Sequence, residues 1–301
     1  MGFASVFRGD VRASPAETPQ IAGQFDGDHI LVPLLTSHAP VVTDQLRVAA
    51  TLARTTDASL QVIKPITALD RTTEEYRREV TDEDEQELVD WAVEQVSTPR
   101  GDGGFLSTPG LVRGIRRIIA ADDVDTLVVP GTSSTGLLRR GITDRLAAHA
   151  DCDVITVNGR AGYEEVASIL LPIAGGPHSG LATDVAQRIA ANCDAWIDIL
   201  HVVDEEASDH QREIVDAYME AAYRRIARPE TTTTWVLEAA DATDAIIEQS
   251  AYYGLTIIGA PTKGRLRQFV SGSTNRSIRQ NAQSLILSAR SNSAAHINDS
   301  E

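Results

Sequence analysis

A loop of glycine, hydroxyl and basic residues late in the sequence has the chemistry of a phosphate-binding site. It follows the apolar run 255–258, and its candidate ligand contacts are Gly259, Thr262, Lys263, Arg265, Gly272, Ser273 and Thr274. Glycine lets the backbone approach a ligand closely, and N–H groups and hydroxyls at the start of a helix bind phosphate oxygens. The loop therefore predicts polyphosphate binding, with a solvated turn and an ordinary serine cap as the alternative.

The elements that must position this loop occur twice along the chain. The apolar run 30–34 recurs as 169–173, and each run continues through a small polar loop into a helical pattern. Further strands are expected at 60–66, 126–129 and 153–157 in the first copy, with a short one around Phe105, and at 196–203, 233–238, 255–258 and 284–288 in the second. Further helices are expected at 73–96, 110–121, 208–226 and 243–253.

This alternation of strands and helices predicts an α/β protein. It is typical of parallel sheets with right-handed crossovers, and the continuous apolar strands indicate a sheet covered on both faces. We therefore expect two tandem, doubly wound, five-stranded parallel sheets, each with strand order 3-2-1-4-5. The expected divisions are a flexible N-terminal segment 1–27, a first domain 28–159, a second domain 166–290 and a polar tail 291–301.

A second loop is expected to face the first across the sheet. Ligands of open α/β sheets bind outside the carboxyl ends of the strands, where the strand order reverses. In this topology that point lies between the first and fourth strands of a copy. In the second copy, Pro172, Ala174, Gly175 and Gly176 therefore border the same site as Gly259.

These motifs together resemble the universal stress protein family in its tandem, two-domain form. Nucleotide-binding members carry Gly, two residues, Gly, nine residues, then Gly and Ser or Thr; here Gly259 and Gly272 keep the spacing, with Thr262 at the second glycine. The resemblance implies an adenine nucleotide alpha hydrolase-like fold that binds ATP or a related adenine nucleotide, accompanied by Mg²⁺. It also implies that Val202 lines the adenine pocket, while Ala174 replaces the aspartate that helps to fix adenosine.

The first copy departs further from the family motif. Gly131 matches the first glycine of the motif, but Asp144 stands where the last glycine is expected, and Leu35 replaces the adenosine-fixing aspartate. A carboxylate in a phosphate cradle repels the ligand, so we expect the first copy to lack nucleotide. The resemblance further implies that the two copies pair through their final strands as a pseudo-dimer, and we expect two chains to form a dimer.

The charge of the chain indicates which solvent conditions and which partners suit it. The 301 residues carry a net charge of −16, and Lys64 and Lys263 are the only lysines. Such a surface stays hydrated at high ionic strength, which favours a halophilic source over ordinary acidity. It argues against DNA or RNA as partners, since phosphate binding needs a basic surface. Without a long apolar run or a signal-peptide pattern, a cytoplasmic location is expected.

The sequence shows no catalytic motif of the Gly-x-Ser-x-Gly or P-loop type. His178 is expected at the surface of a helix start, His201 as a packed strand residue, and Cys152 and Cys193 as small buried thiols. Our first hypothesis is a regulatory protein that binds an adenine nucleotide without significant turnover. The alternative is a ligand-free interaction module that regulates a membrane transporter or another partner, and a slow ATPase ranks last.

Overall fold

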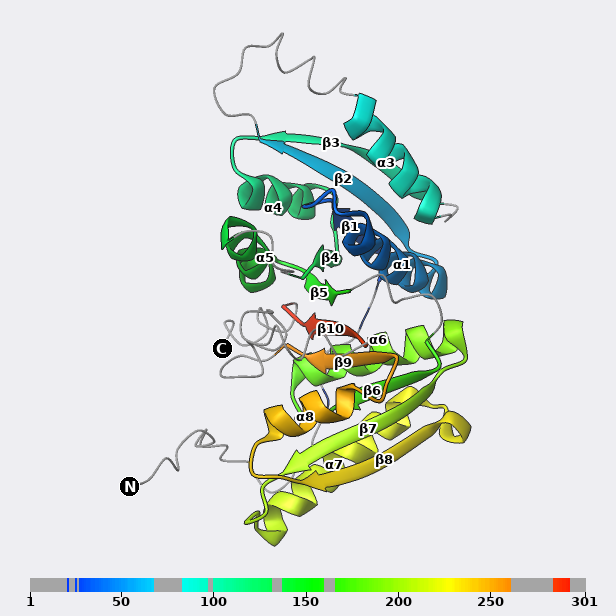
Figure 1. The fold of residues 1–301 in the computed structure, drawn as a ribbon, viewed down its shortest axis with the longest axis vertical. Helices are drawn as coiled ribbons and strands as arrows, with labels where there is room; N and C mark the ends of the chain where they lie inside the picture. Colours follow the sequence, from blue (N-terminus) through cyan, green and yellow to red (C-terminus); the bar gives the residue numbers. More distant parts are fainter. Residues whose placement is uncertain are drawn as a thin grey trace, which may run out of the picture.

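The protein forms one continuous ten-stranded sheet with helices on both faces (Figure 1). The computed structural model describes residues 21, 25, 27–67, 83–96, 100–131, 137–159, 166–260 and 284–292. The first half of the sheet contains β1 (His29–Pro33), β2 (Ser59–Thr67), β3 (Gly101–Thr108), β4 (Thr126–Pro130) and β5 (Asp153–Asn158). The second half contains β6 (Ser168–Pro172), β7 (Trp196–Val203), β8 (Thr232–Glu238), β9 (Leu255–Gly259) and β10 (Leu285–Arg290).

The expected α/β class with a mostly parallel sheet is confirmed. The strand order is β3-β2-β1-β4-β5-β10-β9-β6-β7-β8, so the ten strands form a single sheet where the sequence indicated two. The halves join through β5 and β10, which run antiparallel with Val157 opposite Leu287, whereas the other strand pairs are parallel. This pairing satisfies backbone groups that two separate sheets would leave at exposed edges.

The helices cover the two faces of the sheet in separate layers (Figure 1). One layer contains α1 (Ala39–Thr56), α3 (Glu83–Val96), α6 (Pro177–Cys193) and α7 (Asp209–Ile226). The other contains α4 (Leu111–Ala121), α5 (Leu137–His149) and α8 (Ala242–Ser250). Alternate residues of β1 point to opposite layers: Ile30 belongs to the first core and Leu31 to the second. None of the helices described is long and apolar enough to cross a bilayer.

Local signals define the ends of several helices. The hydroxyl of Ser208 accepts the N–H of Gln211, and the side chain of Gln211 accepts the N–H of Ser208 at 2.8 Å. This capping box starts α7 close to the expected boundary because it satisfies two N–H groups that have no partner inside the helix. Both α1 and α6 end at an aspartate in the left-handed conformation, Asp57 and Asp194.

The third strand of the first half is longer than the sequence indicated. β3 pairs with β2 along its whole length, from Leu60 opposite Gly101 to Thr67 opposite Thr108. A side chain at Gly103 would clash with Val93 of α3, since a Cβ there would lie 2.5 Å from the valine Cγ2. Gly103, one of the glycines that weaken the local strand signal, therefore allows α3 to pack closely on the sheet.

Part of the N-terminal segment that we expected to be flexible packs against the body of the protein. Ile21 is 8% exposed and Phe25 is 2% exposed. The chain then turns at Gly27, whose φ is +55°, and the Thr56 hydroxyl donates to the Gly27 carbonyl at 2.8 Å. Burial of a large apolar side chain contributes about 1.5–3 kcal/mol, which favours the packing of Ile21 and Phe25 against the protein.

Candidate functional site

The candidate site lies in the second half, where β6 and β9 diverge. These strands pair at Ile169 with Leu255 and at Leu170 with Thr256 and then separate. β6 stays paired with β7 as far as Pro172, and β9 stays paired with β10 as far as Gly259. The strand order reverses between β6 and β9, the position at which ligands bind to this class of sheet. Residues 171–179 and 257–260 are hereafter called the divergence site.

Gly259 ends β9 directly against the first turn of α6. A Cβ on Gly259 would lie 2.9 Å from the carbonyl carbon of His178 and 3.0 Å from the nitrogen of Ser179. A larger residue would therefore push α6 away from the sheet. The sequence pattern predicts that this glycine lets a ligand approach closely, whereas its close neighbour in the structure is the α6 backbone.

Two adjacent glycines carry the chain from β6 into α6. Gly175 and Gly176 have φ values of +84° and +79°, which a residue with a Cβ adopts only at a cost. A Cβ on Gly175 would also lie 2.6 Å from the ring of Tyr218, which comes from α7. Gly176 precedes α6 as its N-cap, and Pro177 then occupies the first turn, where its missing N–H costs nothing.

The start of α6 has the features of an anion-binding site. Its N-cap, Gly176, has no side chain that accepts a hydrogen bond from the first turn. The Ser179 hydroxyl instead closes the preceding loop, accepting the N–H of Ala174 at 3.3 Å and donating to the carbonyl of Gly175 at 2.9 Å. N–H groups at a helix start and the positive end of the helix dipole both favour a bound anion.

Two histidines lie beside the divergence site. The N–H of Ser291 donates to Nδ1 of His178 at 3.1 Å, and burial, followed by the charge of Arg290, lowers the pKa of His178. Nδ1 of His201 donates to the Ile173 carbonyl at 2.6 Å, and burial lowers the pKa of His201 although this bond opposes the shift. Both histidines are half-buried: His201 lies in β7 as expected, whereas His178, which we expected at the surface, joins α6 to the end of β10.

Five of the predicted site residues meet at the divergence site: Pro172, Ala174, Gly175, Gly176 and Gly259. Val202 packs with Trp235 and Tyr253 in the core beneath α8, on the face opposite α6. The other predicted residues, Thr262, Lys263, Arg265, Gly272, Ser273 and Thr274, lie outside the described residues. Within the described ranges, no group of three His, Cys, Asp or Glu side chains could hold a metal ion.

The two cysteines are free thiols in different surroundings. Cys152 is 1% exposed, and its burial, together with the nearby Asp153, Asp125 and Asp151, raises its pKa. Cys193 is half-buried at the end of α6. A buried thiol with a raised pKa is held in the unreactive protonated form, so Cys152 acts as a small core residue.

In the first half, the corresponding divergence of β1 and β4 is bridged by a side chain that the sequence analysis missed. Gln45 of α1 is fully buried, and its Nε2 donates to the carbonyls of Pro33 at 3.1 Å and Val128 at 2.9 Å. At the end of β4, the side-chain oxygen of Asn158 lies 1.8 Å from the position that a Cβ on Gly131 would take. A signal for Gln45 was present, because it is a polar residue at a core position of a helical pattern.

The two residues held responsible for the defect of the first copy lie in different surroundings. Asp144 lies inside α5, about two turns after Leu137, and not at the start of a helix. Leu35 packs against the core shared by α4 and α5. Gln45 and Asn158 fill the space between β1 and β4 and beside Gly131, whereas the loop 132–136 of the first copy lies outside the described residues.

Comparisons with known proteins agree with the fold. The model of the universal stress protein family matches residues 166–287, a stretch that contains the divergence site. The structure is similar to a universal stress protein from Archaeoglobus fulgidus DSM 4304, with 13% identity, a TM-score of 0.58 and coverage of 88% of this chain and 98% of that chain. It is also similar to a functionally unknown protein from Pseudomonas aeruginosa PAO1, with 16% identity, a TM-score of 0.54 and coverage of 90% and 96%. No curated protein matches the sequence.

Proposed function

We propose that the protein is regulatory and binds an adenine nucleotide, ATP or a related compound, at the divergence site. The observation that carries this proposal is the geometry at the start of α6. No N-cap side chain accepts a hydrogen bond from the first turn of this helix, and the turn lies against Gly259, where β6 and β9 separate. Phosphate oxygens would accept hydrogen bonds from the N–H groups of this turn. The stretch that matches the universal stress protein model includes every residue involved.

The proposal includes two tandem units, 28–159 and 166–290, each with five strands in the order 3-2-1-4-5. The observed strand order supports this division, and the bridging of β1 and β4 by Gln45 supports binding in the second unit alone. The dimer, the transporter partner, the halophilic source and the cytoplasmic location stay predictions of the sequence.

Binding without significant turnover follows from the composition of the site. Residues 171–179 and 257–260 contain no carboxylate, so these segments supply no carboxylate ligand for a metal ion and no carboxylate base for hydrolysis, and Nδ1 of their one histidine, His178, accepts the N–H of Ser291. Mg²⁺ that accompanies the nucleotide would be held mainly through phosphate oxygens and water. Such a site suits a protein that senses a nucleotide through occupancy.

Thermal unfolding in the presence of ATP, ADP or AMP tests the proposal. The measurement is made in 0.15 M KCl and again in molar KCl, because salt changes the electrostatic interactions of the acidic surface. We expect at least one nucleotide to raise the Tm, and Gly272→Asp to abolish the rise by placing a carboxylate in the predicted phosphate loop. Gly141→Asp is the matched control, since Gly141 is exposed on α5 in open space. The proposal fails if no nucleotide raises the Tm and none copurifies, which would favour the interaction module.

A further inference from the structure

Three arginines on two neighbouring helices differ from the other described arginines. Arg113 and Arg117 of α4 and Arg145 of α5 are exposed and have no ion pair or hydrogen bond within the described residues. The other arginine side chains that the structure describes all have polar partners: Arg47, Arg54, Arg100, Arg116, Arg188, Arg212, Arg224, Arg225, Arg228 and Arg290. The chain has 43 acidic and 27 basic residues, so carboxylate partners for arginine are abundant. The lack of such partners at Arg113, Arg117 and Arg145 is therefore a property of this surface and not of the composition.

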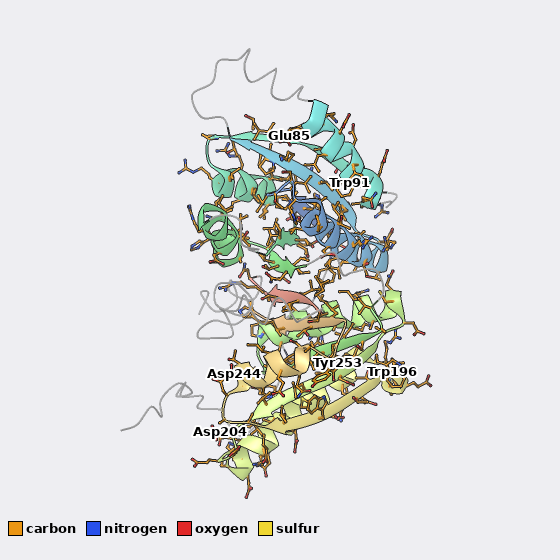
Figure 2. The ribbon with its side chains drawn as sticks, viewed as in Figure 1. Glu85, Trp91, Trp196, Asp204, Asp244 and Tyr253 are labelled. Atoms are coloured by element: carbon orange, nitrogen blue, oxygen red, sulfur yellow. The ribbon has the colours of Figure 1, made fainter. Side chains whose placement is uncertain are left out.

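Among the helices that the structure describes, positive charge is concentrated on these two. α4 carries three arginines and no carboxylate, while α5 carries three arginines and one carboxylate, so together they hold five net positive charges in a chain of net charge −16. The helix described on this side of the sheet in the second half, α8, has the opposite character, with Asp244 and Glu248 and no base (Figure 2 labels Asp244). Arg113, Arg117 and Arg145 are hereafter called the basic face.

The packing of α4 and α5 directs the basic face to solvent. Ile115, Ile119 and Leu146 anchor the opposite sides of these helices in the core above the sheet. Arg116 donates to Asp151 at 2.9 Å, which ties α4 to the residues that follow α5. Arg113 and Arg117 are one helical turn apart and repel each other, so they do not serve the stability of α4.

The chemistry of the basic face distinguishes between anionic partners. Neither α4 nor α5 contains a phenylalanine, tyrosine or tryptophan on which a nucleic-acid base could stack. The large apolar side chains exposed in the described part of the chain, Trp196, Val236 and Tyr252, all belong to the second half, so the described side chains of α4 and α5 offer no apolar anchor for a membrane. Guanidinium groups bind carboxylates through two parallel hydrogen bonds.

We propose that the basic face docks a carboxylate-rich surface of a partner protein. Because the whole chain is acidic, such a partner is repelled at long range and attracted only close to α4 and α5. Screening at about 0.15 M salt limits the repulsion to a range of about 8 Å, so short-range contacts decide the binding. The surface is separate from the divergence site, so it can act whether or not nucleotide is bound.

Fluorescence anisotropy with a labelled deca-glutamate peptide as the probe tests this proposal in 0.15 M KCl. We expect saturable binding that weakens with added salt and falls at least tenfold in Arg113→Glu/Arg117→Glu/Arg145→Glu. Arg54→Glu/Arg100→Glu/Arg224→Glu changes the net charge equally elsewhere on the surface and should change the affinity less than twofold. A third variant has lysine at the three positions of the basic face. It keeps the charge but loses the planar guanidinium groups that form two parallel hydrogen bonds, so we expect it to bind the peptide more weakly than the parent does.

Three results would overturn the proposal. The first is no binding of the peptide by the parent protein, and the second is an equal loss in both glutamate variants, which would indicate a non-specific charge effect. The third is tighter binding of a single-stranded oligonucleotide, or of phosphatidylglycerol vesicles, through the same arginines. Circular dichroism and the Tm of each variant establish that the fold is kept.

Discussion

Asp184 of α6 and Arg225 of α7 form a two-pronged ion pair that also holds the start of the described chain. Arg225 donates through Nη2 to Oδ2 of Asp184 at 2.7 Å and through Nε to the other oxygen. The N–H of Phe25 donates to Asp184 at 2.8 Å, and Arg225 donates to the carbonyl of Ile21 at 2.7 Å. Since the chain then reaches Thr56 on α1, this segment links the two halves independently of the sheet.

Replacement of Asp184 by asparagine should destabilise the protein. The change leaves Arg225 without its counter-ion in a partly buried site, where the side chain of Asp184 is 16% exposed and that of Arg225 is 25% exposed. We therefore expect the free energy of unfolding to fall by about 1–3 kcal/mol. Urea denaturation measures this loss. Glu220→Gln is the control, because it breaks the exposed Arg224–Glu220 pair and should cost less than about 0.5 kcal/mol. Equal costs in the two variants would contradict a structural role for the pair.

Phe25→Ala tests whether the N-terminal segment contributes to the core. Removal of a side chain that is 2% exposed should cost about 3 kcal/mol or more through lost burial and the cavity left behind. Limited proteolysis should then cleave the chain before residue 28 much faster than in the parent. If the unfolding free energy changes by less than about 0.5 kcal/mol, the segment does not stabilise the fold.

Stability should fall as the pH drops below about 6.5. Burial lowers the folded-state pKa of His178 and of His201, so the unfolded chain binds more protons in acid. The stability that the two neutral histidines contribute is fully present above pH 6.5 and is lost as the pH falls through their pKa values in the folded protein. The Tm between pH 5 and 8 should therefore depend less on pH in His178→Gln/His201→Gln than in the parent, and an equal pH dependence in the two proteins would contradict this assignment.

Ala174→Asp should strengthen the binding of adenosine and AMP. Ala174 is exposed in the loop after β6, at the position where the family resemblance implies an adenosine-fixing aspartate. A hydrogen bond to a charged group contributes about 1.5–3 kcal/mol, so we expect about a tenfold gain in affinity by calorimetry. Leu35→Asp introduces the same side chain at the matching position of the first half and should have no effect. A gain from both variants, or from neither, would count against the assignment.

Local patterns were sufficient to predict much of the fold. The capping box at Ser208 fixes the start of α7, and the apolar runs ending at Pro33 and Pro172 locate β1 and β6. In each case the signal and the structure involve residues close together in sequence. The short prediction for β3 failed because its glycines have low strand propensity, and its length is set by pairing with β2.

The candidate site was less predictable because its contacts join distant segments. The sequence identified Gly259 as a place of close approach, but nothing local indicates that the approaching backbone is that of His178. No local pattern around Phe25 predicts its burial, because its N–H donates to Asp184, far away along the chain. The two acceptors of Gln45 likewise belong to β1 and β4 and not to its own helix.

The antiparallel pairing of β5 with β10 has a consequence for how the chain folds during synthesis. β5 emerges from the ribosome roughly 130 residues before the strand that covers its outer edge. At the usual speed of translation this interval is on the order of ten seconds, long enough for the first half to fold. Throughout that time β5 presents an unpaired apolar edge, a template on which another nascent chain can add a strand. The first half therefore depends on protection from such pairing until the last strand of the sheet arrives.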